Sequence, residues 1–506
     1  MHIAFICFGF ENIGVEYVSA CLKERGHRTS LVFDPALFDT YVLKSGVLGK
    51  MFDSRARIVE RVLASKPDLV AFSVMTDNYQ RACSMAEQIK SKDASLPVIF
   101  GGVHPTSVPE MVIKQPYVDY LCVGEGEEAI PELCDALAGG SDTSGIRNIW
   151  SKKDGRIFAN APRPMSEDLD ALPFPDKELF YSELPVLKRG VYRINVGRGC
   201  HLRCSFCTNS LMRDIYGHAG YKKRKRSVRN VMQELKQAKA KYDFRHVLII
   251  DDWFTDDVVW LEEFADLFKQ EIGVSFACDV FPGKCDQKVV ALLQRAGCTV
   301  ASIGIQTYSE KLRRDVLHRQ DSNDDIVEAM ALFQKTKIFV YADFILGIPG
   351  QDQEELLNIA HFVNKVRADF VFFLWLRYYP GTPITQMAVT NAWITSEQLD
   401  EINAGKNTGS YFDRSLTYKK EAAKLASFLS LAPLLPRGVV SAMIDRKMYR
   451  IFPSSSLFYF RFMSIIVPFM KRLWSGKKGT FYFTVQENCW FHLYYALQTL
   501  KANFRN

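Results

Sequence analysis

The chain has 506 residues, which is too long for one hydrophobic core, so about three domains are expected at typical domain sizes. Hydrophobic residues make up 48% and charged residues 24% of the sequence, as in an ordinary soluble protein. The net charge of +7 is small for this length and gives no reason to expect a nucleic-acid partner.

The twelve cysteines are scattered, and only those between positions 200 and 207 form a cluster. This pattern is typical of a reducing compartment rather than of a disulfide scaffold. Residues 1–6 lack a basic leader and a cleavage site and predict a first strand. No run of about 18 uncharged apolar residues is present to form a spanning helix. We therefore expect a cytoplasmic protein.

Residues 1–150 alternate between strand-like and helical stretches. Strands are expected at 3–8, 29–33, 69–74, 97–100 and 120–123, and helices at 14–25, 55–64 and 79–91. This alternation predicts a doubly wound, Rossmann-like parallel sheet, which binds ligands at the carboxyl ends of its strands. Gly101 and Gly102 end one strand, and glycine there lets the backbone approach a ligand closely.

Residues 151–189 separate this region from the next strand pattern. They contain Asp154-Gly155, Pro162, Pro164 and the segment Leu172-Pro173-Phe174-Pro175-Asp176. Prolines and acidic residues break long periodicity and favour an extended linker. The simplest interpretation is a connector with no chemical role.

Residues 190–385 contain a second βα repeat, for which strand-end residues are the candidates for chemistry. Its strand-like runs are 191–196, 246–251, 274–280, 299–305, 338–348 and 370–378. After the first run, Cys200, Cys204 and Cys207 stand at C-x3-C-x2-C spacing. That loop is too tight, and one ligand short, for a typical closed zinc site. A [4Fe–4S] cluster needs four ligands, so three cysteines leave one iron open.

The three cysteines, with Phe206 before the last of them, resemble the signature of radical S-adenosylmethionine (SAM) enzymes. The resemblance implies a partial (βα)6 barrel in which the open iron binds SAM, and SAM cleavage yields a 5′-deoxyadenosyl radical. The alternative is a cysteine-rich turn or a redox disulfide pair.

The resemblance also implies SAM contacts at other strand ends. Asp251 or Asp252 would accept hydrogen bonds from the SAM amino group, whereas Thr255 and Asp256 have the simpler role of capping the next helix. Gln306 would lie near the ribose and the methionine portion, and Gly347 near adenine. Arg319 would hold the methionine carboxylate, which suits a guanidinium. A plain strand-to-helix turn is the alternative for Gly347.

Residues 1–150 are similar to cobalamin-binding domains, which carry an Asp-x-His-x-x-Gly motif, then Ser-x-Leu, then Gly-Gly. The matching positions here are Gly14, Ser73, Met75, Gly101 and Gly102. Glu11 stands in place of the histidine, so the usual lower axial ligand of cobalt is missing. The resemblance also points to His104 as a contact to the corrin or its tail, with a turn histidine as the alternative. A Rossmann-like domain that lost its cofactor or binds another is the alternative for the whole region.

The basic run at 221–227 raises the possibility of a nucleic-acid or membrane partner, but we expect a solvated surface leading into a helix capped by Ser227. Residues 386–506 have helical composition and no recognised motif. Within them, 457–474 is rich in Phe, Ile, Met and Trp, with Arg461, Lys471 and Arg472. This composition suits an interfacial helix at a membrane surface, and equally a core helix or a cover over the barrel mouth.

We therefore expect a cobalamin-dependent radical SAM enzyme, with a [4Fe–4S] cluster, SAM and cobalamin, and within that group a methyltransferase acting on an unactivated carbon. The implied mechanism methylates cobalamin with one SAM and uses a second to make the substrate radical that collects the methyl group. The expected partners are a small-molecule substrate, apolar or lipid-like if 457–474 contacts the inner membrane, and an electron donor such as flavodoxin or ferredoxin. Alternatives are an enzyme similar to anaerobic magnesium-protoporphyrin ester cyclases, a radical SAM enzyme without cobalamin, and a non-enzymatic cobalamin carrier or sensor.

Overall fold

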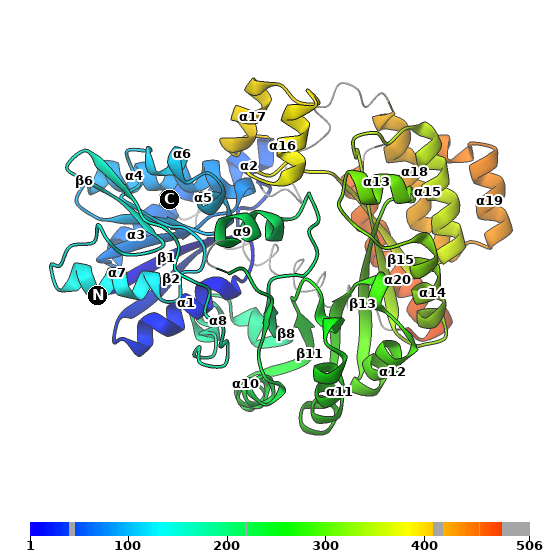
Figure 1. The fold of residues 1–506 in the computed structure, drawn as a ribbon, viewed down its shortest axis with the longest axis horizontal. Coiled ribbons are helices and arrows are strands. Elements are labelled where there is room, and N and C mark those ends of the chain that lie inside the picture. Colours follow the sequence, from blue (N-terminus) through cyan, green and yellow to red (C-terminus); the bar gives the residue numbers. More distant parts are fainter. Residues whose placement is uncertain (40–45, 218–219, 408–417, 455, 478–506) are drawn as a thin grey trace.

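The computed structural model describes residues 1–39, 46–217, 220–407, 418–454 and 456–477. Two separate sheets, each with helices packed against it, form the two main parts of the molecule, and mainly helical segments follow the second sheet (Figure 1). The α/β fold expected from the sequence, with a Rossmann-like domain, a partial barrel and a helical C-terminal region, is confirmed.

The N-terminal sheet has the strand order β2-β1-β3-β4-β5-β6-β7, and its first five strands in the chain are parallel. Those strands are β1 His2–Phe8, β2 Arg28–Asp34, β3 Leu69–Ser73, β4 Val98–Gly101 and β5 Tyr120–Cys122. The chain moves outward from β1 to β2 and then returns to the other side of β1 with β3. This reversal creates a switch point between β1 and β3, where doubly wound sheets bind their ligands.

Helices cover both faces of this sheet because its strands are buried on both sides. One face packs against α1 Ile13–Glu24 and α7 Ala129–Ala138. The other face packs against α3 Arg55–Ala64, α4 Tyr79–Lys92 and α6 Pro109–Ile113. The short helices α2 Gly46–Met51 and α5 Val103–Ser107 complete this part of the chain.

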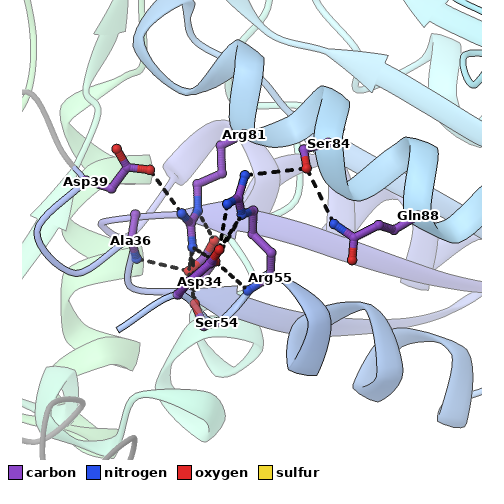
Figure 2. Close-up of polar contacts among 9 residues, drawn as sticks. Asp34, Ala36, Asp39, Ser54, Arg55, Arg81, Ser84 and Gln88 are labelled. Carbon is purple, nitrogen blue, oxygen red and sulfur yellow. Dashed lines mark hydrogen bonds and ion pairs between the residues drawn. The ribbon is translucent and has the colours of Figure 1, made fainter. Parts of the chain in front are cut away.

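A buried ion pair fixes the carboxyl end of β2 (Figure 2). The Arg81 guanidinium on α4 donates to both oxygens of Asp34, at 2.5 and 3.1 Å, and Asp34 also accepts from Ser54 at 2.8 Å. The two charged side chains are only 8% and 0% exposed. Because each charge is compensated by the other and by further hydrogen bonds, the pair ties α4 and the start of α3 to the end of β2.

The expectation of an extended connector at 151–189 is corrected by the structure. Strands β6 Ile149–Lys153 and β7 Arg156–Ala159 form an antiparallel hairpin that extends the first sheet, and α8 Lys177–Glu183 packs near β2. The turn is Asp154-Gly155, with φ of 50° and 75°. Asp-Gly between two strands favours a two-residue hairpin, a signal that the expectation treated only as a chain breaker.

The second sheet has six parallel strands in the order β15-β14-β13-β12-β11-β8, so β8 and β15 are its two edges. The strands are β8 Arg189–Ile194, β11 Asp243–Ile249, β12 Ser275–Val280, β13 Cys298–Gln306, β14 Phe339–Leu346 and β15 Phe370–Trp375. Its helices are α9 Thr208–Tyr216, α10 Val228–Lys241, α11 Val258–Leu267, α12 Gln287–Ala296, α13 Glu310–Asp315, α14 Asn323–Gln334 and α15 Gln353–Val366. The sheet remains an open, curled half-barrel with the order that sequential right-handed βα units produce.

The C-terminal helices close two sides of the half-barrel. They are α16 Pro383–Thr390, α17 Ser396–Asn403, α18 Lys419–Leu431, α19 Arg437–Asp445 and α20 Ser456–Ser475. From α20, Met463 and Val467 pack with Tyr341 and Phe370 on the inner face of the sheet. In Figure 1, α16 and α17 lie at the top, between the N-terminal domain and the helices around α15. Within the described ranges, no helix combines the length and apolar character needed to cross a membrane.

Candidate active site

The three cysteines lie in one loop directly after β8 and β9 (Gly197–Arg198). Cys200 and Cys204 are buried, and Cys207 is half-buried. The N–H of Cys207 donates to the carbonyl of Cys204 at 3.1 Å. The segment after α13 also holds the loop, since the N–H of Ser205 donates to the carbonyl of Leu317 at 3.1 Å. Burial, together with the neighbouring thiols of Cys207 and Cys200, raises the pKa of the Cys204 thiol to about 12, so the three sulfurs are close neighbours.

The loop fits an iron–sulfur cluster better than a single metal ion. In the part of the chain that the structure describes, no three His, Cys, Asp or Glu side chains are arranged to hold one ion. Thiolates that share a zinc ion lie within about 4 Å of each other, because each Zn–S bond is about 2.3 Å. The cysteines of a [4Fe–4S] cluster bind different irons and stand farther apart.

The two aspartates after β11 have different environments. Asp251 is buried, and its Oδ1 accepts the N–H of Val196 at 2.9 Å, so this carboxylate fixes the start of the cysteine loop. Asp252 is exposed, and its charge acts on the thiols of Cys200 and Cys207. Asp252 therefore faces the cysteines and remains open to an ammonium group, whereas one oxygen of Asp251 is already used.

The prediction that Thr255 and Asp256 cap the next helix is wrong. Helix α11 begins at Val258, and its cap is Asp257, which accepts the N–H groups of Val259 and Trp260 at 3.0 Å each. Asp256 instead pairs with Lys225 at 2.7 Å.

Gln306 and Arg319 meet at the end of β13. Gln306 has a φ of 73°, and its amide folds over Gly304, where an added Cβ would collide with it. Arg319 is 6% exposed, and its Nη1 lies 3.3 Å from the place of that Cβ. Nε of Arg319 donates to Asp321 at 2.9 Å, while Nη2 has no hydrogen-bond partner among the described residues. A buried N–H without a partner is costly, so this guanidinium is suited to an anionic ligand.

Gly347 and Phe206 lie on the side of the cysteine loop that faces the C-terminal helices. Gly347 has a φ of 77°, and its N–H donates to Oε1 of Gln351 at 2.8 Å, which fixes the turn after β14. Phe206 packs with the apolar cluster that includes Leu376 and Ile384. Phe206 therefore anchors the loop to α16.

The expectation that the basic run is a solvated surface is wrong. Its strand β10 Arg224–Lys225 pairs with β9, and the Tyr221 hydroxyl accepts the N–H of Cys200 at 3.0 Å, so the run lies against the start of the cysteine loop. Its side chains are engaged in ion pairs, namely Lys223 and Lys225 with Asp256, Arg224 with Glu125, and Arg226 with Glu234. These carboxylates are distant in sequence from most of the run, which is why a local charge pattern did not reveal them.

Arg198, at the start of the cysteine loop, and Arg224 join this loop to the N-terminal domain. Arg198 contacts Glu125 at 3.3 Å and Glu127 at 2.6 Å, and Arg224 contacts Glu125 at 2.6 Å. The Tyr216 hydroxyl accepts the N–H of Glu125 at 2.8 Å. The carboxyl ends of the two sheets are therefore held against each other. One ion-pair network includes the loop after β5 and the cysteine loop.

The switch point of the N-terminal sheet is closed by short contacts between strand ends. Asn12, which caps α1, donates through Nδ2 to the hydroxyl of Ser73 at 3.0 Å, so it spans β1 and β3. Gly101 is opposite Ser73 in the β3–β4 pairing. Gly102 has a φ of 102° and is exposed, and a Cβ there would lie 2.8 Å from the carbonyl of Val74. Only glycine suits this position, and the backbone there is open to a ligand.

Met75 and His104 lie on either side of this crevice. Met75 is half-buried, and its N–H donates to Asn78 at 2.9 Å. His104 is fully buried, with Nδ1 at 3.2 Å from the hydroxyl of Thr76 and its ring against Tyr79. Burial lowers the pKa of His104 to about 3, so the imidazole is neutral. This environment is that of an interior turn histidine.

Glu11, which replaces the axial histidine of the cobalamin motif, is occupied by cations. Its two oxygens contact Lys177 at 2.8 Å and Arg193 at 3.1 Å. Although burial acts to raise it, the pKa of Glu11 is held below its usual value by Lys177 and Arg193. The carboxylate therefore ties α8 and β8 to the end of β1 and does not serve as a metal ligand.

Two protein-family descriptions match the chain. "Radical SAM superfamily" matches residues 194–363, and "B12 binding domain" matches residues 4–134. The chain belongs to the radical SAM superfamily. It is an enzyme of that superfamily with an N-terminal B12-binding domain, and its cofactors are a [4Fe–4S] cluster, SAM and cobalamin.

This radical SAM enzyme is similar to several proteins at modest sequence identity. An uncharacterised methyltransferase of Pyrococcus horikoshii is 27% identical over 67% of this chain and 72% of its own length. An anaerobic magnesium-protoporphyrin IX monomethyl ester cyclase of Rubrivivax gelatinosus is 26% identical over 72% of this chain, which spans 64% of the cyclase. The solved radical SAM methyltransferase TsrM of Kitasatospora setae superposes with a TM-score of 0.64 at 16% identity, covering 85% of this chain and 88% of TsrM. That likeness concerns the fold.

The inner face of the radical SAM barrel carries two carboxyl groups. Asp279 on β12 and Asp343 on β14 flank Ser302 on β13, whose hydroxyl donates to Asp343 at 3.1 Å. Burial raises the pKa of Asp279 to about 7, with the charge of Asp343 contributing, and burial raises the pKa of Asp343 to about 6. Ile250, directly after β11, and Leu374 on β15 are 42% and 57% exposed. Their exposure indicates that apolar side chains near the carboxyl ends of these strands are not fully covered.

Sequence reasoning missed Asp343 and the Arg198–Glu125 contact. Asp343 interrupts the apolar strand Phe339–Leu346, and a polar residue inside such a strand is a signal that was available. The Arg198–Glu125 contact joins residues 73 positions apart, so no local pattern predicts it.

Proposed function

We propose that this chain is a cobalamin-dependent radical SAM enzyme that transfers a methyl group to an unactivated carbon of a small molecule. The observation that carries the proposal is the ion-pair network between Arg198, Arg224 and Glu125. It joins the cysteine loop to the strand ends of the B12-binding domain. A substrate between them would meet both cofactors, which is the geometry that radical formation followed by methyl transfer requires.

When bound, the cluster supplies the electron that cleaves SAM to the 5′-deoxyadenosyl radical, and cobalamin carries the methyl group. Cys200, Cys204 and Cys207 hold the cluster. Asp252 accepts from the SAM ammonium group, and the unpartnered N–H of Arg319 donates to its carboxylate.

Two further residues complete the proposed SAM site. Gln306 lies beside Arg319 and faces the ribose, and the turn at Gly347 admits the adenine. Asp251 and Phe206 act through the loop, which they hold from either side.

The corrin lies in the crevice formed by Ser73, Met75, Gly101 and Gly102. The exposed backbone at Gly102 supports this position, since no Cβ separates the corrin from the strand ends. Glu11 does not ligate cobalt, because Lys177 and Arg193 hold it. His104 supports the crevice from the interior and does not touch the corrin.

The substrate chamber is the inner barrel face around Asp279 and Asp343. Its exposed apolar side chains support an apolar or lipid-like substrate, and the two carboxyl groups support a hydrogen-bond donor on that substrate. Lining of this kind, mostly apolar with a few convergent polar groups, is typical of small-molecule sites.

We propose a cytoplasmic location with peripheral contact to the inner membrane, and flavodoxin or ferredoxin as electron donor. The cysteines support a reducing compartment, since all eleven in the described ranges are free. We further propose the division into a B12-binding domain at 1–150, a connecting segment at 151–189 that is folded rather than extended, a barrel at 190–385 and a C-terminal region at 386–506. The β6–β7 hairpin then extends the first domain into the connecting segment.

The proposal is tested by anaerobic spectroscopy and product analysis. After purification from cobalamin-fed cells and anaerobic cluster reconstitution, we expect cluster and corrin absorption together, and 5′-deoxyadenosine from SAM under reducing conditions. With SAM labelled in the methyl group, the label should move to the corrin and then to a substrate. Cluster absorption without corrin bands would favour a radical SAM enzyme that does not use cobalamin.

A cyclase is the second candidate function, because the chain is also similar to the Rubrivivax gelatinosus cyclase. Methyl transfer adds one CH2 to the product, whereas ring formation with an oxygen from water does not. The product mass therefore separates the two functions.

A further inference from the structure

The net positive charge of the chain is concentrated between positions 419 and 477. Between positions 419 and 477 there are eleven Lys and Arg but only two Asp and Glu, a net charge of +9. The whole chain carries +7, so the remainder has a net charge of −2. A charge asymmetry of this size within one protein favours an anionic partner for that segment.

Helix α20 in this segment has one buried and one exposed apolar face. Met463 and Val467 are 8% and 0% exposed, since they pack on the inner face of the barrel sheet. Ile465, Phe469 and Leu473, spaced four residues apart, are 43%, 51% and 63% exposed. Residues at this spacing share one side of a helix, so α20 presents a continuous apolar stripe outward.

Cations surround the C-terminal end of this stripe. Lys337 donates to the carbonyl of Ser475 at 3.1 Å, and Arg472 is exposed. Lys471 and Lys477 contact Asp369 at 3.6 and 2.7 Å, so this one carboxylate offsets part of their charge. Trp474, 62% exposed, lies at the same end. An apolar stripe with Trp and flanking cations is typical of helices that lie in the interface of an anionic membrane.

We propose that the outward face of α20 docks on an anionic lipid bilayer, with Ile465, Phe469 and Leu473 inserted between headgroups and Lys337 and Arg472 against lipid phosphates. This surface deepens the proposed peripheral membrane location and does not depend on the proposed methyl transfer. Helix α20 lies on the surface and does not cross it, since the described helices include none able to span.

The experiment measures sedimentation of the full-length, cofactor-loaded enzyme with vesicles. Phosphatidylglycerol–phosphatidylethanolamine vesicles should bind it, and phosphatidylcholine vesicles should bind it at least about tenfold more weakly, with high salt reducing the difference. The double substitution Phe469→Asp with Leu473→Asp should lower binding by about tenfold or more, and Arg472→Glu by about tenfold. The matched control is Val259→Asp on α11, where an equally apolar side chain is 80% exposed, and binding there should not change.

Each variant should still cleave SAM to 5′-deoxyadenosine and unfold at the wild-type temperature. If the Asp variants unfold early, Phe469→Ser with Leu473→Ser repeats the test with a smaller change. Equal vesicle binding by the α20 variants and the wild type overturns the proposal that α20 is the docking face, and it leaves the proposed peripheral membrane location standing. Absence of wild-type binding overturns both. A change of oligomeric state in the α20 variants without a change in vesicle binding also overturns the proposal, because the stripe would then contact a second copy.

Discussion

The site at the strand ends of the barrel consists mainly of side chains, whereas the site at the strand ends of the B12-binding domain consists mainly of backbone. At the barrel, side chains form the site, namely three cysteines, Asp252 and Arg319, whose Nη2 has no hydrogen-bond partner among the described residues. At the B12-binding domain the site is mostly backbone, where a glycine at a φ of 102° brings β3 and β4 within contact distance. The first kind of site is specified by residue identity, and the second by the space that side chains leave free.

This difference explains why one site is easier to recognise than the other. Cysteine ligands leave a spacing in the sequence that few other structures require. A crevice for a corrin requires small residues at strand ends, which occur for many reasons. Glu11, which stands where cobalamin-binding domains have the histidine ligand of cobalt, forms a buried ion pair with Lys177 instead.

The largest expected effect is on the side-chain site. Cys204→Ala should remove the cluster and reduce 5′-deoxyadenosine formation by more than about a thousandfold, because one of three thiolate ligands is lost. Iron content and electron paramagnetic resonance check this, and cobalamin retention should persist. Cys285→Ala is the matched control, since it removes another buried thiol outside the loop and should retain the cluster. An active Cys204→Ala enzyme would contradict the cluster assignment.

The next effect tests the framework of the backbone site. Arg81→Met should lower the free energy of unfolding of the N-terminal domain by about 3–5 kcal/mol, because it leaves the carboxylate of Asp34 buried without its cation. Arg55 lies beside Arg81 in Figure 2. Arg55→Met should lower the free energy of unfolding by less than about 1 kcal/mol, since the ion pair of Arg55 with Asp53 is partly exposed. Urea unfolding followed by circular dichroism measures both, and equal costs would show that burial of the pair is unimportant.

A smaller effect is expected at the crevice itself. Gly102→Ala should strain the backbone by about 1–3 kcal/mol and weaken cobalamin retention about tenfold, with the cluster unchanged. Gly140→Ala is the matched control, because φ is also positive there at 64° but an added Cβ meets nothing within 4 Å. Corrin absorbance after gel filtration is the measurement. Unchanged retention in Gly102→Ala would count against the crevice.

The smallest effect concerns the chamber. The pKa of Asp343 in the folded protein is raised to about 6 by burial, above its unfolded value of about 3.9, so the folded state holds the extra proton between these values. Its stability therefore falls as pH rises through that window. Asp343→Asn should raise the free energy of unfolding by about 1 kcal/mol at pH 8, after allowance for the open side of the chamber, and not at pH 3. Asp279 faces the same serine and should show the same sign.

A pH profile of urea unfolding distinguishes this from a simple packing change. A gain of stability in Asp343→Asn that is equal at all pH values would show that the charge is not its cause. A loss at pH 8 would indicate that the ionised carboxylate is stabilised by groups other than Ser302.

The sequence by itself determined the order of strands and helices and the cysteine loop. Alternation of apolar strands with amphipathic helices reflects which faces are buried, and the spacing of Cys200, Cys204 and Cys207 reflects direct ligation. Both are local properties that can be recognised in the amino-acid sequence alone. The Asp154-Gly155 hairpin was also available locally, although it was taken for a linker.

Only the tertiary structure decided how charges are used. The basic run at 221–227 lies beside the start of the cysteine loop because β10 pairs with β9, and its partners Glu125 and Asp256 come from other parts of the chain. The structure likewise separated Asp251, held by Val196, from Asp252, and buried His104 against Tyr79. An ion pair or a hydrogen bond depends on which side chains meet in space, and residues far apart in sequence meet only after the two sheets are packed together.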